Sequence, residues 1–133
     1  MSRPQQSRTC RIRCGRRFGT WVSERDIRGD VGALPATVCR QLRAVITEAV
    51  DNVITHARAT RLSVRVEVTD AQVEARVADD GIGPPDPPIY GLGLGSMAAR
   101  ARDLGGSFGF DAAAKGGTIV TWRVPLMSPD QNA

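Results

Sequence analysis

The sequence is poor in several features, and each shortage excludes a class of protein. No apolar run approaches the ~18 residues that a membrane-spanning helix needs. The arginines near the N-terminus have no apolar stretch behind them, so no secretory signal is expected. Three cysteines, an odd number without paired spacing, argue against a disulfide scaffold and for a reducing compartment. These absences predict a small, soluble, cytoplasmic domain.

The positive net charge of +4 comes from one end of the chain. Residues 1–17 contain six arginines and no acidic residue, whereas the rest of the chain has a slight acidic excess. A basic arm can bind phosphate backbones or a membrane surface, but a solvated leader or a coding bias toward arginine is the simpler interpretation. Because the body is not basic and only 5% of residues are aromatic, no specific nucleic-acid binding is expected. We expect a flexible basic leader over 1–17, one domain over 18–126 and a disordered tail over 127–133.

Hydrophobic periodicity predicts one long helix, one short helix and alternating strands. In chain order, the expected elements are a short strand within 18–30, a helix over 35–57, strands over 61–69 and 72–79, a helix over 96–104, and strands over 107–111 and 118–125. Each of the two later strand pairs is joined by a turn, which indicates antiparallel hairpins. The expected fold is a two-layer α/β sandwich, a mostly antiparallel mixed sheet with helices on one face.

A polar stripe runs along the long predicted helix. Glu48, Asn52 and His56 are four residues apart, so each is displaced by only ~40° around the axis from the one before. A carboxylate, an amide and an imidazole in one row can hold a hydrated magnesium ion and orient a water or hydroxyl, with phosphates completing the coordination. A solvated helix edge with incidental polar residues explains the same stripe.

A second motif, Asp79-Asp80-Gly81-Ile82-Gly83, follows a predicted strand. The carboxylate of Asp79 can accept a hydrogen bond from an exocyclic amine such as that of adenine, and Gly81 and Gly83 let a flat ring approach closely. A plain turn is the alternative, because Asp-Gly is a common turn signal.

The glycine-rich run Gly91-Leu92-Gly93-Leu94-Gly95 precedes the short helix. Exposed backbone N–H groups and a helix start together form a phosphate-binding concavity, although a flexible linker gives the same sequence. The only lysine, Lys115, is followed by glycine, so a P-loop is excluded. A dinucleotide-binding fold is excluded as well, because the run follows an antiparallel hairpin. The last motif, Gly116-Gly117-Thr118, opens the final strand and by itself is a glycine turn.

In this order and spacing, the four motifs resemble the ATP-binding domain of one superfamily. It unites sensor histidine kinases, gyrase B-type topoisomerases, ninety-kilodalton heat-shock chaperones and mismatch-repair ATPases. The chain is most similar to histidine kinases of the nitrate-sensor type. The segments that carry the resemblance are TEAVDNVITHARATRLSV, VADDGIGPP, GLGLGSMAARARDLGGSF and GGTIVTWRVP. The resemblance implies the Bergerat-type ATP-binding fold and a two-component signalling function with ATP and magnesium as cofactors.

The resemblance also implies a role for individual residues. Glu48 would be the general base or water-orienting carboxylate, Asn52 the magnesium ligand, and His56 a neighbour of the phosphates. The adenine amine would be bound by Asp79 with help from Thr118. The remaining implied contacts are Gly81 and Gly83 in the pocket floor, Gly91 and Gly93 on the phosphates, and Arg58 and Arg100 as further phosphate partners.

One departure from a complete histidine kinase is visible in the sequence. The only histidine, His56, falls inside the ATP-site motif, so no phosphoacceptor histidine is present. We expect either an excised catalytic domain, whose partners are a dimerising histidine segment and indirectly a response regulator, or a stand-alone relative. The alternatives are a serine kinase of the anti-sigma-factor type with the same fold, and a binding module without catalysis. The helix after the glycine run favours the sensor kinase, whereas the missing histidine favours the serine kinase.

Overall fold

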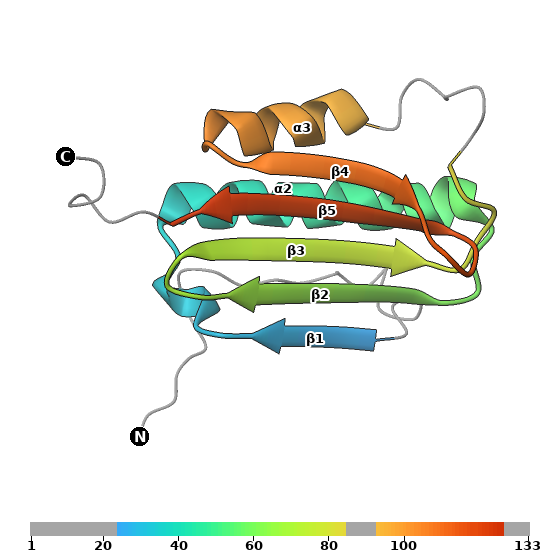
Figure 1. The fold of residues 1–133 in the computed structure, drawn as a ribbon, viewed down its shortest axis with the longest axis horizontal. Helices are drawn as coiled ribbons and strands as arrows, with labels where there is room; N and C mark the ends of the chain where they lie inside the picture. Colours follow the sequence, from blue (N-terminus) through green and yellow to red (C-terminus); the bar gives the residue numbers. More distant parts are fainter. Residues whose placement is uncertain (1–23, 85–92, 127–133) are drawn as a thin grey trace.

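The chain is described by a computed structural model over residues 24–84 and 93–126 (Figure 1). Its elements are β1 (Glu24–Arg28), the short 3-10 helix η1 (Val31–Ala33), α2 (Ala36–Asn52), the π-helical turn η2 (Val53–Ala57), β2 (Leu62–Val68), β3 (Gln72–Asp79), α3 (Leu94–Asp103), β4 (Ser107–Ala112) and β5 (Thr118–Pro125). The expected leader, residues 18–23 and 85–92 of the expected domain, and the expected tail lie outside the described residues.

The five strands form one mixed sheet in the order β1-β2-β3-β5-β4. The pairs β2–β3, β3–β5 and β4–β5 are antiparallel, and β1 alone runs parallel to its neighbour β2. Helix α2 packs across β3, and α3 packs across β4 and β5 (Figure 1). This arrangement confirms the predicted two-layer α/β sandwich and both predicted hairpins.

The core lies between the helices and one face of the sheet. All seven apolar residues expected to face inward from the long helix are buried: Val38, Leu42, Val45, Ile46, Ala49, Val50 and Val53. Alternate residues of β2, β3 and β5 complete the same cluster, with Trp122 at 0% exposure. Because side chains alternate across a strand, the intervening charged residues Arg65, Arg76 and Arg123 are left on the outer face.

The long helix ends differently from the prediction. The α-helical part stops at Asn52, and the chain continues through a wider π turn to Ala57 before Arg58 adopts a left-handed conformation (φ 52°). Turns of this kind occur often at functional sites. His56 lies in this π turn, whereas Glu48 and Asn52 lie in the α-helical part.

Two further findings concern α3 and the cysteines. Helix α3 begins at Leu94, two residues earlier than predicted, and Gly105 (φ +79°) follows its last turn. Cys39 of α2 is buried and disulfide-bonded. A single bond does not make a disulfide scaffold, and the expectation of a reducing compartment stays a prediction. None of the helices in the described part of the chain is long and apolar enough to span a membrane.

Candidate functional site

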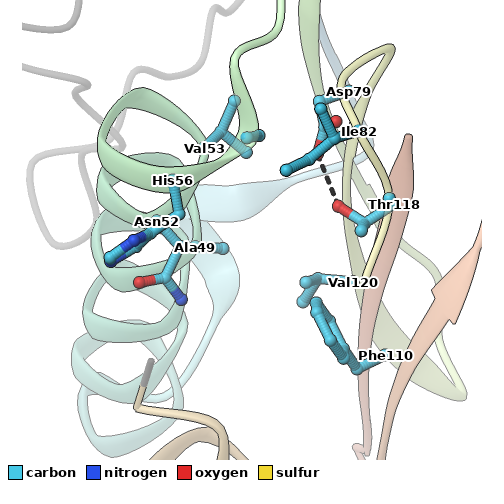
Figure 2. A pocket seen from close by; sticks show the side chains of 11 residues that line it. Ala49, Asn52, Val53, His56, Asp79, Ile82, Phe110, Thr118 and Val120 are labelled. Carbon is cyan, nitrogen blue, oxygen red and sulfur yellow. Dashed lines mark hydrogen bonds between the residues drawn. The ribbon is translucent and has the colours of Figure 1, made fainter. Parts of the chain in front are cut away.

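A pocket opens between the C-terminal end of the long helix and the ends of β3 and β5 (Figure 2). One wall comes from α2 and η2, and the other comes from β4, β5 and the segment after β3. The lining residues are Ala49, Asn52, Val53, His56, Ala57, Asp79, Ile82, Gly83, Phe110, Thr118 and Val120. Most are apolar, and polar side chains stand on both walls. Such a pocket suits a flat ring that carries a polar edge.

The most enclosed polar group in the pocket is the carboxylate of Asp79, which is 6% exposed. Its Oδ1 accepts a hydrogen bond from the backbone N–H of Gly81 at 2.7 Å, and its Oδ2 accepts one from the hydroxyl of Thr118 at 2.5 Å (Figure 2). A carboxylate has about four lone-pair positions, so Asp79 retains capacity for a further donor such as an exocyclic amine. The structure therefore brings together Asp79 and Thr118, which are separated by 38 residues in the sequence.

The opposite wall holds the polar residues of the helix end. Asn52 is the last residue of α2, and His56 lies in the π turn that follows; both line the pocket (Figure 2). This wall therefore contributes an amide and the exposed residue His56 to the pocket lining. Two of the three residues of the predicted stripe meet at this pocket.

Glu48 is not among the residues that line the pocket, and it lies beside the start of α3 instead. A Cβ atom built on Gly93 would be 2.1 Å from Oε2 of Glu48 and 2.5 Å from its Cδ. Gly93 also has a left-handed conformation (φ +75°) and caps the start of α3. The structure thus places the predicted catalytic carboxylate against the predicted phosphate-binding glycine run. Gly91 of that run lies outside the described residues.

Two glycines at the pocket have no room for a side chain. A Cβ atom on Gly81 would be 2.0 Å from the carbonyl oxygen of Ala57, and one on Gly117 would be 1.9 Å from the carbonyl oxygen of Asp79. Gly117 also has a φ of +94°. The sequence motif around Thr118 is therefore a close-packed support for Asp79 rather than a glycine turn alone. Gly83 (φ +88°) is among the residues that line the pocket, whereas Gly81 is not.

Replacing Gly81 by alanine is expected to destabilise the fold, because the new methyl group would meet a backbone oxygen that cannot move aside. We expect a loss of about 1–3 kcal/mol, as for other overpacked sites, measured as a lower midpoint in urea unfolding. Gly95→Ala is the matched control, since Gly95 lies in α3 with no atom within 4 Å of a built Cβ. It should raise stability by about 0.5–1 kcal/mol through helix propensity. Equal effects of the two substitutions would contradict the close contact at Gly81.

The structure does not support a phosphate-binding role for Arg100. Its guanidinium donates a hydrogen bond to the side-chain oxygen of Gln41, which ties α3 to α2. Gln41 precedes Asn52 by eleven residues, or ~16 Å along a helix, so this contact is far from the pocket. Arg58 is exposed and does not line the pocket either.

Several pocket residues were not predicted from the sequence. Phe110 reaches the pocket from β4, and Val120 reaches it from β5 (Figure 2). Their signal was the strand alternation, which places both on the same face as Trp122. Ile82 sits between the two predicted glycines and is 67% exposed, which is unusual for a large apolar side chain.

The arrangement provides a buried acceptor, an apolar slot and a polar wall, which together suit a purine nucleotide. No group of three or more histidine, cysteine, aspartate or glutamate side chains within 24–84 and 93–126 could hold a metal ion. A magnesium ion does not need such a group, because it is usually held by one or two protein oxygens together with substrate phosphates.

The comparisons with known proteins agree with this geometry. Residues 37–128 match the family described as histidine kinase-, DNA gyrase B-, and HSP90-like ATPase. The chain is 37% identical over 92 residues to the nitrate/nitrite sensor protein NarQ of Escherichia coli, covering 67% of this chain and 16% of NarQ. It is 34% identical over 85 residues to the oxygen sensor histidine kinase NreB of Staphylococcus carnosus, covering 62% of this chain and 24% of NreB.

A solved structure shows the same likeness. The ATP binding domain of PrrB from Mycobacterium tuberculosis is 28% identical, with a TM-score of 0.57, and the match covers 67% of this chain and 69% of that one. The chain spans about a quarter or less of the length of the two curated relatives. The family match extends over more than half of the chain and includes Asp79, Asn52 and Thr118. On this evidence, the chain belongs to the histidine kinase-, DNA gyrase B-, and HSP90-like ATPase family.

Proposed function

We propose that this chain is the ATP-binding catalytic domain of a two-component sensor histidine kinase. It transfers the γ-phosphoryl group of ATP to a histidine on a separate dimerisation segment. The observation that carries the proposal is the buried Asp79–Thr118 pair at the end of an apolar pocket, with Asn52 and His56 among the residues of the opposite wall. Phosphoryl transfer requires mainly positioning and charge neutralisation, and these groups can supply both.

In this proposal one wall of the pocket binds the adenine base, and the phosphates lie along the other. Asp79 accepts a hydrogen bond from the adenine amine, and the apolar side chains Phe110 and Val120 contact the base. The phosphates extend toward His56 and the start of α3, where Gly93 offers a backbone N–H group. A contact of Gly91 with the phosphates stays a prediction. Glu48, placed beside Gly93, orients the attacking group or accepts its proton.

Magnesium fits the same wall. The amide oxygen of Asn52 is the kind of neutral ligand that magnesium accepts beside phosphate oxygens and water. When bound with the nucleotide, the ion would neutralise phosphate charge. Asn52 would hold it, and Glu48 would remain free to act on the acceptor.

The partners in this proposal follow from the relatives. NreB is described as an oxygen sensor histidine kinase and NarQ as a nitrate/nitrite sensor protein. A dimerising histidine segment would therefore receive the phosphoryl group and pass it to a response regulator. Both steps would take place in the cytoplasm, where this domain is expected. The serine-kinase alternative has no supporting observation among the comparisons and enters only as an outcome of the test on Glu48.

Calorimetric titration with ADP and magnesium tests the binding half of the proposal. We expect saturable binding at one site, and its absence at millimolar nucleotide would contradict the proposed function. Inosine diphosphate is the informative second ligand, because its base carries a carbonyl group where adenine has the amine. Weaker binding of inosine diphosphate than of ADP is expected if Asp79 accepts the amine proton.

Asn52→Ala is expected to remove most of the gain in ADP affinity that magnesium produces. The substitution deletes a cation ligand, so we expect the magnesium-dependent part of the affinity to fall by about tenfold or more. Titrations with and without magnesium measure this part directly. Asn52→Asp retains an oxygen ligand and should preserve the magnesium effect, and Asp51→Asn is a control on the neighbouring helix position. An unchanged magnesium effect in Asn52→Ala would place the ion elsewhere.

A further inference from the structure

Two loops at the mouth of the pocket are held together by a small set of contacts. One loop, residues 57–61, runs from the last residue of η2 to the start of β2, and the other, residues 79–83, begins at the last residue of β3. The backbone N–H of Ile82 donates to the carbonyl of Ala57 at 2.9 Å, and that of Asp80 donates to the carbonyl of Arg61 at 3.3 Å. Ala57, Ile82 and Gly83 also line the pocket. The rim of the pocket is therefore built from both loops at once.

The side chain of Asp80 makes the remaining contacts between the loops. Its Oδ1 accepts hydrogen bonds from the backbone N–H groups of Thr60 at 2.8 Å and Arg61 at 2.9 Å. Its Oδ2 accepts one from the hydroxyl of Thr60 at 2.8 Å. The N–H groups of Arg61 and Thr60 and the hydroxyl of Thr60 hold the pKa of the Asp80 carboxyl below its usual value. The charged form is thus the one that these contacts favour.

Asp79 and Asp80 point to opposite sides of the chain, as neighbouring residues at the end of a strand do. Asp79 turns into the pocket and is buried, whereas Asp80 is exposed and does not line the pocket. The orientation of the Asp79 carboxylate nevertheless depends on the same segment, because its Oδ1 accepts a hydrogen bond from the backbone N–H of Gly81, the residue after Asp80. Any shift of residues 80–82 would move a hydrogen-bond donor of Asp79.

We propose that Asp80 is a positioning residue for the nucleotide site: its three contacts to residues 60 and 61 hold residues 79–83 against the end of η2. The inference rests on the proposed function, since it assumes that Asp79 accepts a hydrogen bond from the adenine amine. Asp80 touches no nucleotide atom and acts through Asp79 and the rim residues. Its effect should therefore fall on base recognition rather than on the phosphates.

The test compares ADP with inosine diphosphate, each with magnesium, by calorimetry on the full chain. Asp80→Ala removes all three contacts and should lower ADP affinity by about tenfold, the size of one lost hydrogen bond to a charged acceptor. It should also reduce the preference for ADP over inosine diphosphate to about a third or less of its original value, because Asp79 would be less well oriented. A purely structural role for Asp80 would leave that preference unchanged once the variant is folded.

Three further variants make the outcome decisive. Asp80→Asn keeps an oxygen that accepts from both backbone N–H groups, so it should recover most of the preference. Thr60→Val removes only the hydroxyl contact and should lose about threefold in ADP affinity together with part of the preference for ADP over inosine diphosphate. It decides the question if Asp80→Ala does not fold. Asp70→Ala, in the exposed β2–β3 turn, should bind as the unchanged chain does.

The proposal and the proposed function can fail separately. Failure of the unchanged chain to bind ADP would overturn the proposed function. Normal binding by the unchanged chain, with no change of preference in folded Asp80→Ala or in Thr60→Val, would overturn the role of Asp80.

Discussion

Asp79→Asn is expected to lower the affinity for ADP by about ten- to a hundredfold while leaving the affinity for inorganic pyrophosphate almost unchanged. The substitution replaces one acceptor oxygen by an N–H₂ donor. The carboxylate of Asp79 already accepts from Gly81 and Thr118, so the amide would have to turn its donor toward either the hydroxyl or the adenine amine. In the first orientation the hydroxyl of Thr118 can accept from the N–H₂, but the one remaining oxygen must then serve both the Gly81 N–H and the adenine amine. In the second orientation two donors face each other in a nearly closed site. Either loss costs about 1–3 kcal/mol.

Calorimetry with both ligands separates recognition of the base from general damage to the pocket. Asp111→Asn is the matched control, because Asp111 lies exposed in β4 and makes no contact with the pocket. Equal losses for ADP and pyrophosphate would mean that Asp79 is only a structural residue of the turn. Thermal unfolding of the variant should accompany the titrations, since Asp79 also supports Gly81.

Glu48→Gln is expected to bind ADP with magnesium nearly normally and to lose phosphoryl transfer by about 10²–10⁴-fold, the range typical of a missing general base. The amide keeps the shape of the side chain beside Gly93 but cannot accept a proton. Transfer has to be measured with a dimerising histidine segment supplied in the same chain or added separately, because His56 is the only histidine of this sequence.

Glu67→Gln is the control for the loss of one carboxylate, because Glu67 is exposed in β2 and does not line the pocket. Normal transfer by Glu48→Gln would remove Glu48 from the chemical step and leave it as a neighbour of the phosphate-binding glycines. Phosphorylation of a serine on a small partner protein, with no histidine segment present, would overturn the proposed function itself. The chain would then act as a serine kinase of the anti-sigma-factor type.

The secondary structure could be predicted from the sequence because it depends on local periodicity. The buried stripe of α2 and the alternation in β2, β3 and β5 follow from side-chain directions that repeat every 3.6 or 2 residues. The same reasoning located Asp79 at the end of a strand and Thr118 at the start of another. The prediction of one α-helix to Ala57 failed at η2, because the wider turn that carries His56 has no signal in the apolar pattern. The predicted start of α3 was two residues late.

The division of work among the polar residues of the site depends on contacts between distant parts of the chain. Asp79 and Asp80 are adjacent, yet only the approach of Thr118 and of Thr60 decides which carboxylate faces the pocket and which joins two loops. Arg100 likewise has the charge to bind phosphate, but the packing of α3 against α2 brings its guanidinium to Gln41, to which it donates a hydrogen bond.

The sequence by itself determined the elements, the buried faces and the chemical types available at the site. The tertiary structure alone decided that Phe110 faces the pocket, that Glu48 lies against Gly93, and that Asp80 lies outside the pocket. The physical reason is that hydrogen bonds and close contacts require positions in space, and these are fixed only when the sheet order β1-β2-β3-β5-β4 brings separate segments together.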